Sequence, residues 1–177
     1  MAWLTNASRT VYENPWISVR EDDVTGPSGD GIYGVVTLRH PAVFVVAVDE
    51  SDRICLITLD RYTIGRSIEV PAGGTDGEDP LVAARRELLE ETGLQAEHWT
   101  AIGTMNALNG VTVAPEHVFL ARGLSAAAEP PHDDEGIEDV AWVPFAEALQ
   151  MVADGRITDG ETVAALAYAG IHLGRFR

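Results

Sequence analysis

The sequence lacks the features that would place it in a membrane or in an oxidising compartment. None of its apolar runs approaches the roughly 18 residues needed to span a bilayer. Its amino terminus, MAWLTNASRT, has no basic segment followed by an apolar core, so we expect no secretory signal. The single cysteine, Cys55, cannot form an internal disulfide. These absences predict a reduced, cytoplasmic setting without a membrane partner.

Basic residues are also scarce. The chain has 12 Lys and Arg residues against 28 Asp and Glu residues, which gives a formal net charge of −16 over 177 residues. A field of that sign repels phosphate backbones, so we expect no nucleic-acid partner. A small anionic substrate stays possible, because a bound divalent cation reverses the local charge.

What is present predicts one α+β domain over residues 1–177. Neither a fixed-period repeat nor a low-complexity tract divides the chain. Short β-rich pieces occupy residues 10–39, and two apolar runs that favour a hairpin of buried strands follow them. The expected elements are strands at 42–49, 54–60, 116–124 and 138–145, and helices at 80–92, from Pro144 onwards, and from the capping-box spacing of TDGE (158–161) to Ala169.

The helix expected at residues 80–92 has clear boundary signals. Asp79 can cap its amino end, Pro80 suits the first helical position, and Gly93 is a natural stop. The helix carries an acidic stripe formed by Glu87, Glu90 and Glu91. The opposite side collects the apolar residues that we expect to face the core: Leu81, Val82, Leu88 and Leu89.

Like charges at this spacing weaken a helix, so the acidic stripe needs a reason. Ala83 and Ala84 lie beside the glutamates and leave room for a ligand or another backbone to come close. Arg86 precedes Glu90 by one turn and can pair with it. Carboxylates are the ligands that Mg²⁺ and Mn²⁺ prefer. Two interpretations stay open from these residues: a divalent-metal site and a solvated helix face.

The same residues resemble the Nudix box, whose pattern is Gly-x5-Glu-x7-Arg-Glu-apolar-x-Glu-Glu-x-Gly-apolar. Glu78 and the run from Arg86 to Leu94 match this pattern position by position. One departure is that four residues, not five, separate Gly73 from Glu78. The resemblance implies a Nudix fold, an α/β/α sandwich with a mixed sheet, with the box at residues 73–94 and the core at residues 41–177.

The similarity extends over nearly the whole chain to the ADP-ribose pyrophosphatase-like branch of the Nudix hydrolases. The segments HPAVFVVAVD, ICLITLDRYTIGRSIEVPAGG and GIEDVAWVPFAEALQMVADGRITDGETVAALAYA carry it. The resemblance implies that Mg²⁺, or Mn²⁺, is held by Glu87, Glu90, Glu91 and the backbone carbonyl of Ala72. Candidate substrate contacts are Arg61, Arg66, Glu69 and Glu116. For the arginines, ordinary surface ion pairs are the alternative, and for Glu116 it is a plain edge-strand charge.

The implied reaction is attack of water on a pyrophosphate phosphorus, with Glu90 and Glu91 in the catalytic set. In the resembling enzymes the general base often comes from the acidic loop before the last long strand. Here the candidates are Glu135, Asp134 and Asp133, of which we favour Glu135. The alternative is that this stretch is only an acidic turn.

The implied substrate is a nucleoside diphosphate derivative, ADP-ribose or a nucleotide sugar. Two positions depart from the ADP-ribose-cleaving members, namely Asn109 in place of a proline and Asp60 in place of a glutamine. A nucleoside triphosphate pyrophosphohydrolase is the nearest alternative, and a non-catalytic nucleotide sensor is more remote. A Nudix-fold isomerase would need a catalytic cysteine, which Cys55 within a strand does not supply.

The amino-terminal strands, within residues 1–40, resemble an extra sheet of the same branch. In that branch the sheet often builds a domain-swapped homodimer whose partner helps to bind the nucleoside. The resemblance therefore implies an additional antiparallel sheet and a homodimer.

Overall fold

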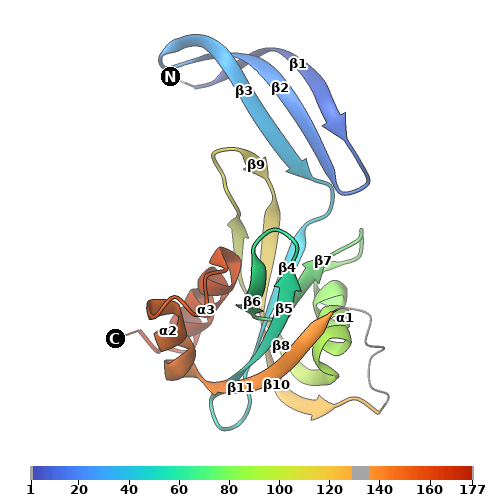
Figure 1. The fold of residues 1–177 in the computed structure, drawn as a ribbon, viewed down its shortest axis with the longest axis vertical. Helices are drawn as coiled ribbons and strands as arrows, with labels where there is room; N and C mark the ends of the chain where they lie inside the picture. The colour runs from blue at the N-terminus through green and yellow to red at the C-terminus, as the bar shows by residue number, and fades with distance from the viewer. Residues whose placement is uncertain (1, 129–135, 177) are drawn as a thin grey trace. The chain divides into compact units, whose positions relative to one another are not determined.

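The computed structural model describes residues 2–128 and 136–176, and Figure 1 shows its secondary structure. The chain forms two compact units. We call Met1–Pro41 with Asn106–Pro115 the N-terminal unit, and Ala42–Met105 with Glu116–Arg177 the core unit. Among the described residues, no helix is long and apolar enough to cross a membrane.

The N-terminal unit is the predicted additional antiparallel sheet. Its strands are β1 (Leu4–Glu13), β2 (Ile17–Gly26), β3 (Gly29–Leu38) and the short β9 (Thr112–Val113). The first three run antiparallel in sequence order, and β9 pairs with β3 in parallel. Gly29 closes the β2–β3 turn at φ 104°, a left-handed conformation that glycine adopts without a Cβ clash.

The core unit holds two small sheets between helices (Figure 1). One sheet has the order β7-β4-β10-β8 and the other β11-β5-β6. The strands are β4 (Ala42–Ala47), β5 (Arg53–Arg61), β6 (Gly65–Glu69), β7 (Ala72–Gly74), β8 (Leu94–Asn106), β10 (Pro115–Ala126) and β11 (Ile137–Pro144). The helices are α1 (Pro80–Thr92), α2 (Phe145–Ala153) and α3 (Gly160–His172).

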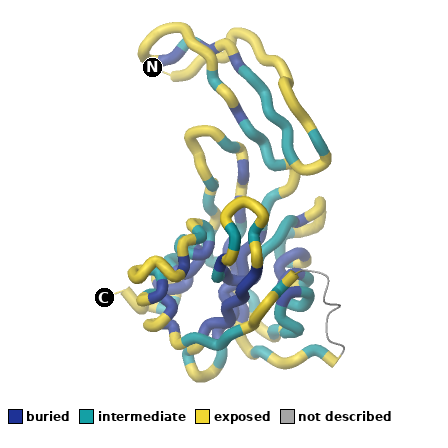
Figure 2. Tube along the Cα trace, viewed as in Figure 1, coloured by how far each residue is buried: buried dark blue, intermediate teal, exposed yellow. Residues whose placement is uncertain are grey.

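The alternation of β4 explains why helices cover both faces of its sheet. Successive strand side chains point to opposite faces, and here both sets are buried, as Figure 2 shows for the centre of this unit. One set joins the cluster that contains Leu88 of α1: Val43, Val45 and Ala47. The other joins the cluster that contains residues of α2 and α3: Phe44, Val46 and Val48. This is the predicted α/β/α sandwich.

The predicted hairpin of residues 42–49 and 54–60 is wrong. The strands β4 and β5 lie in different sheets and share only an isolated bridge between Val48 and Ile54. On one edge β10 pairs with the whole of β4, from Ala42 to Ala47. On the other edge β7 pairs only with Ala42 to Phe44, and past that point the chain meets β5 only at the Val48–Ile54 bridge before β5 joins β6 and β11.

The face of α1 that meets the protein also differs from the prediction. Ala83 and Ala84 are buried with Leu88, whereas the side chain of Val82 is 50% exposed. Two members of the acidic stripe, Glu87 and Glu91, are buried with these alanines, whereas Glu90 is partly exposed. Small side chains let a neighbouring backbone approach, and polar partners compensate the carboxylates there.

Candidate active site

The local sequence positions α1 as the boundary signals predict. The Oδ1 atom of Asp79 accepts a hydrogen bond from the backbone N–H of Leu81 at 2.9 Å. Gly93 ends the helix in the left-handed conformation at φ 68°, and its N–H donates to the carbonyl of Leu89. With both ends held, the last two turns present the acidic stripe at a defined place.

Arg86 binds a set of oxygen acceptors around this stripe. Its Nη1 atom donates to Glu87 at 2.8 Å and to Glu90 at 2.9 Å, and its Nε atom donates to Glu78 at 3.0 Å. Its Nη2 atom donates to the carbonyl of Gly74 at 2.8 Å. Burial alone would lower the pKa of Arg86, but the hydrogen bonds and the carboxylate charges outweigh burial and raise it. The guanidinium therefore stays charged and orients three glutamates of the box, two of them in the acidic stripe.

The strand β7 lies directly against the acidic stripe. The N–H of Ala72 donates to Oε2 of Glu91 at 2.8 Å. A Cβ atom placed on Gly73 would stand 2.2 Å from the carboxylate of Glu87, closer than any real contact. Glycine at this position leaves room for the buried carboxylate of Glu87, which any side chain would displace.

A cavity of about 340 Å³ has two residues of β7 in its lining. Its lining combines backbone of β7, residues of β4 to β6 with the turn that joins β5 and β6, and the start of α3: Ala42, Phe44, Arg61, Thr63, Ile64, Glu69, Ala72, Gly73, Asp159 and Glu161. Because Ala72 and Gly73 line the cavity and also contact the box glutamates, the cavity and the acidic stripe belong to one site. Two predicted contacts, Arg61 and Glu69, are among its lining residues.

Arg61 and Glu69 form a close two-point ion pair. The distances are 3.1 Å from Nε to Oε1 and 2.6 Å from Nη2 to Oε2, and Glu69 is 4% exposed. The hydrogen bond with Glu69 is the main cause that raises the pKa of Arg61. The only arginine in the described lining of this cavity therefore has its charge balanced by a neighbour.

Glu116 is buried beside the cavity, with an exposed fraction of 4%. It pairs in register with Ala42, one of the lining residues. Among the described residues, its Oε2 atom has no hydrogen-bond partner. Burial, followed by the charges of Glu161 and Asp159, raises the pKa of Glu116 to about 7.

Asp159 and Glu161 were predicted only as part of a capping box, in which Thr158 would cap the helix. The structure instead has Asp159 as the N-cap of α3, with Oδ2 accepting from the N–H of Thr162 at 2.7 Å. Both acidic side chains line the cavity. The available signal was an acidic pair at a helix start, which is ambiguous because capping explains it equally well.

The other predicted residues fall outside this cavity. Arg66 pairs with Glu138 at 3.5 Å and is not a lining residue. Glu135, Asp134 and Asp133 lie outside the described residues. The thiol of Cys55 is buried and near Glu91, and burial raises its pKa to about 12, so it is no nucleophile.

The donor set of the acidic stripe fits a hard divalent cation. Glu87, Glu90 and Glu91 offer carboxylate oxygens on one side of α1, and glycine at position 73 leaves room for them. Within the described ranges, no three acidic, histidine or cysteine side chains are grouped closely enough to hold a cation together. Arg86 and the N–H of Ala72 contact these carboxylates in the present arrangement.

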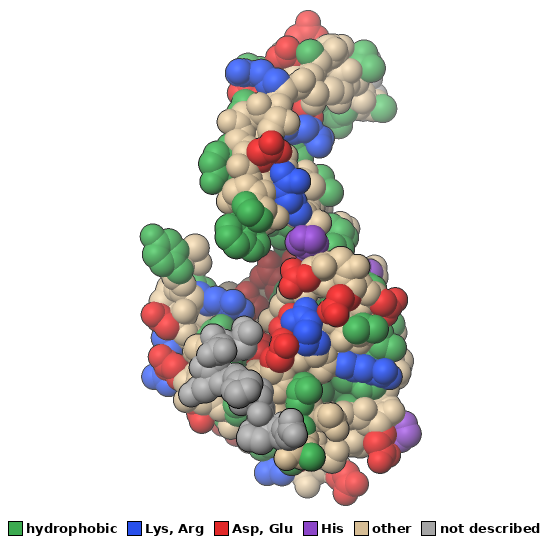
Figure 3. Space-filling view, turned by 90° about the vertical axis from the view of Figure 1, so that its right-hand side faces the viewer, with side chains coloured by type: hydrophobic (Ala, Val, Ile, Leu, Met, Phe, Trp, Pro, Cys, Tyr) green, Lys and Arg blue, Asp and Glu red, His purple; other side chains and the backbone are tan. Residues whose placement is uncertain are grey.

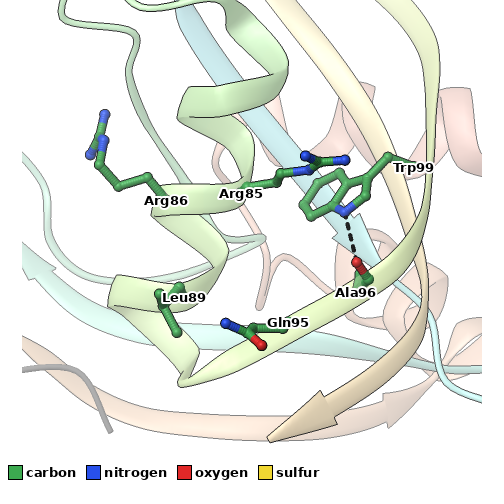
Figure 4. Close-up of a pocket in the computed structure, with 6 residues that line it drawn as sticks. All are labelled: Arg85, Arg86, Leu89, Gln95, Ala96 and Trp99. Atoms are coloured by element: carbon green, nitrogen blue, oxygen red, sulfur yellow. Dashed lines mark hydrogen bonds between the residues drawn. The ribbon is translucent and has the colours of Figure 1, made fainter. Parts of the chain in front are cut away.

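A second hollow, of about 500 Å³, lies along another side of α1 (Figure 4). It is lined by Arg85, Arg86, Leu89, Gln95, Ala96 and Trp99. The guanidinium of Arg85 lies over the ring of Trp99, 6.0 Å from its centroid, and the indole N–H donates to the carbonyl of Ala96. No carboxylate lines this hollow within the described chain, so it offers no metal ligands.

Comparison with known proteins identifies the family. A model of the NUDIX domain matches residues 38–166, and a model of the nucleoside diphosphate sugar hydrolase N-terminal domain matches residues 3–36. The chain belongs to the NUDIX family, as the box predicts, and it is a pyrophosphohydrolase of that family. Members of this family generally use a divalent metal ion.

Individual relatives agree with this assignment. The ADP-ribose pyrophosphatase of Mycobacterium tuberculosis is 34% identical over 94% of this chain and 80% of its own length. A GDP-mannose pyrophosphatase of Yersinia enterocolitica is 38% identical over 61% of this chain and 58% of its own. The fold is shared with a solved ADP compounds hydrolase at a TM-score of 0.85, with 21% identity, over 100% of this chain and 97% of that one.

Proposed function

We propose that this protein hydrolyses the pyrophosphate bond of a nucleoside diphosphate linked to a sugar, with ADP-ribose as the favoured substrate and Mg²⁺ as the metal. The observation that carries the proposal is the contact of the box glutamates with β7, which also lines the cavity. Relatives named for ADP-ribose and GDP-mannose support a nucleotide-sugar substrate.

The box residues would hold the metal. Glu87, Glu90, Glu91 and the carbonyl of Ala72 are the proposed ligands, and Mn²⁺ is the second candidate ion. When bound, the ions would neutralise the diphosphate and stabilise the charge that develops on the leaving oxygen. Arg86 holds Glu87 and Glu90 in place. Preorganisation of this kind avoids reorganising charged groups during the reaction.

The proposed bond change is attack of water on one phosphorus and cleavage of the bridging P–O bond. Glu135 is the proposed base that accepts the proton of the attacking water. Among the candidate substrate contacts, Arg61, Glu69 and Glu116 are in or beside the cavity. Arg66 is the weakest candidate because it pairs with Glu138 away from it.

A substrate panel tests the proposal. Purified protein with Mg²⁺ would be incubated with ADP-ribose, NADH, GDP-mannose, diadenosine polyphosphates and nucleoside triphosphates, with products identified by chromatography. We expect AMP and ribose 5-phosphate from ADP-ribose. Preferred cleavage of a triphosphate would favour the house-cleaning alternative, and no turnover with any metal would favour a nucleotide sensor.

We further propose that the protein is a homodimer that associates through the N-terminal unit. Few of the large hydrophobic side chains of this unit are buried, and Figure 2 shows its tube mostly exposed or intermediate. Its exposed large hydrophobic residues are Trp3, Leu4, Val11, Tyr12, Trp16, Ile32, Leu108, Val111 and Val113. A second copy of the chain would remove such surface from water.

Sedimentation velocity of the purified protein tests the dimer. We expect a species of twice the chain mass, and we expect Trp16→Glu, at a side chain that is 70% exposed, to shift it toward the monomer. Ile171→Glu is a matched control, because Ile171 is 69% exposed on α3 of the core unit. A monomer at all concentrations would refute the dimer and leave the proposed reaction unaffected.

A further inference from the structure

The cavity beside β7 carries more negative charge than the one arginine in its described lining balances. Arg61 donates two hydrogen bonds to the carboxylate of Glu69. Asp159 and Glu161 line the same cavity, and no basic side chain among the described residues is paired with them. An anionic group such as a terminal phosphate would meet net repulsion here.

An unsatisfied acceptor points into this part of the molecule. On β10, Val118 and Leu120 belong to the cluster that contains residues of α3, and Glu116 is on the same strand face because it precedes Val118 by two positions. Its carboxyl lies close enough to Glu161 and Asp159 for their charges to act on it. Its Oε2 atom has no partner within the described chain. A buried polar atom left in this state calls for a ligand that completes it.

We infer that Asp159, Glu161 and Glu116 form a subsite that binds hydroxyl groups of an uncharged sugar attached to the diphosphate of the substrate. Hydroxyls donate hydrogen bonds to carboxylates and bring no negative charge into the cavity. The hydrophobic part of the lining, Phe44 and Ile64, suits the apolar face of a sugar ring. The inference rests on the proposed function, since it assigns the sugar half of that substrate.

The protonation of Glu116 supports the same ligand. With its pKa near neutral pH, the carboxyl is present partly as an acid that donates one hydrogen bond and accepts others. A hydroxyl group likewise donates and accepts, so it can pair with either form. A metal ion would not bind the acid form, and a diphosphate, whose oxygens only accept hydrogen bonds, could pair with the acid form but not with the ionised form.

Two ligands that differ only in the sugar test the inference. ADP-ribose and the methyl ester of ADP share the nucleoside, the diphosphate and its charge, but the ester has no sugar hydroxyls beyond the diphosphate. Their affinities would be measured by calorimetry in EDTA, so that neither is hydrolysed. The variants are Glu161→Ala and Glu116→Gln. The control is Glu147→Gln, an exposed glutamate in the first turn of α2, as Glu161 is in the first turn of α3.

We expect wild-type protein to bind ADP-ribose at least about tenfold more tightly than the methyl ester, since hydrogen bonds to charged groups are worth that much. Glu161→Ala should reduce the preference to about threefold or less, through weaker binding of ADP-ribose alone, and Glu147→Gln should leave it unchanged. The ratio of kcat/KM for the two compounds with Mg²⁺ should fall in parallel.

Equal binding of both ligands by wild type would overturn the inference, as would a preference that survives in both variants. The proposed function fails in a different way. If wild type with Mg²⁺ cleaves neither compound yet prefers ADP-ribose in EDTA, the reaction is refuted and the sugar subsite stands.

Discussion

Two groups of carboxylates in the core unit differ in how their negative charge is balanced. The box group packs against β7 beside Arg86: Glu87, Glu90 and Glu91. The cavity group lines the 340 Å³ cavity that contains Arg61 or lies beside it: Glu69, Glu116, Asp159 and Glu161. Figure 3 shows, on the face that it draws, acidic side chains gathered around a basic one on this unit.

Acidic residues that lie close together in this unit need not have the same function. In the box group, arginine and backbone N–H groups orient oxygens that remain chemically suited to a hard cation. In the cavity group, one arginine balances one glutamate, and burial raises the pKa of both Glu116 and Glu161. We therefore propose cation binding for the first group and hydroxyl recognition for the second.

The largest effect should come from removing a proposed metal ligand. We expect Glu91→Gln to lower kcat at least about 100-fold with the fold intact, because a preorganised ligand contributes several kcal/mol to transition-state stabilisation. Steady-state hydrolysis of ADP-ribose with Mg²⁺ measures this. Glu97→Gln, at an exposed position on β8, is the matched control. Equal activity of Glu91→Gln and Glu97→Gln would refute the proposal that Glu91 is a metal ligand.

Removing the organising arginine should affect both activity and stability. Arg86→Gln removes the guanidinium that pairs with the buried Glu87, so we expect kcat/KM to fall about 10- to 100-fold and the free energy of unfolding to fall by about 2 kcal/mol. The neighbouring Arg85→Gln removes an exposed guanidinium from the other hollow and is the control. If Arg85→Gln loses activity and Arg86→Gln does not, Arg85 and not Arg86 orients the box glutamates.

A methyl group at residue 73 of β7 should displace the carboxylate of Glu87 without removing any charge. Gly73→Ala forces a Cβ against the Glu87 carboxylate, so we expect a loss of about 1–3 kcal/mol of stability together with lower activity. Urea denaturation measures the stability. In Gly110→Ala the new Cβ meets no atom within 4 Å, so both stability and activity should change little. An unaffected Gly73→Ala protein would show that β7 and α1 do not need this close contact.

The smallest predicted effect is a pH dependence in the cavity group. The pKa of Glu116 is raised from 4.5 to about 7, so the proton favours the folded state, and the resulting stability is full below about pH 4.5 and lost as the pH rises through about 7. Glu116→Gln keeps a neutral group at all pH values. Relative to this variant, wild type should lose about 1 kcal/mol, or about 2–4 °C in melting temperature, between about pH 5 and pH 8.

Thermal melts in EDTA at several pH values would measure this difference. Glu138→Gln, at an exposed glutamate of β11, should show no such trend relative to wild type. A constant gap between Glu116→Gln and wild type would mean that Glu116 titrates at an ordinary pKa.

Local signals predicted the box helix but not its orientation. Asp79, Pro80 and Gly93 specify its ends, and the structure confirms them. The helical wheel predicted that Leu81, Val82, Leu88 and Leu89 face the core; Leu88 is buried as predicted, but Val82 is exposed, and Ala83 and Ala84 are buried instead. A polar stripe on a helix predicts a solvent-exposed face when its partners are unknown. Here the partners include Ala72 and Gly73, which belong to another element, β7.

The box motif and its spacing along the chain were enough to predict the family and the sandwich of helices and strands, and they supply candidate cation ligands that stay a prediction. Sequence spacing could not predict which strands share a sheet, or that Glu116 of β10 lies near Asp159 and Glu161 of α3. Strand pairing and the pKa of a buried acid depend on what surrounds them in space. Residues more than forty positions apart in the chain supply those surroundings here.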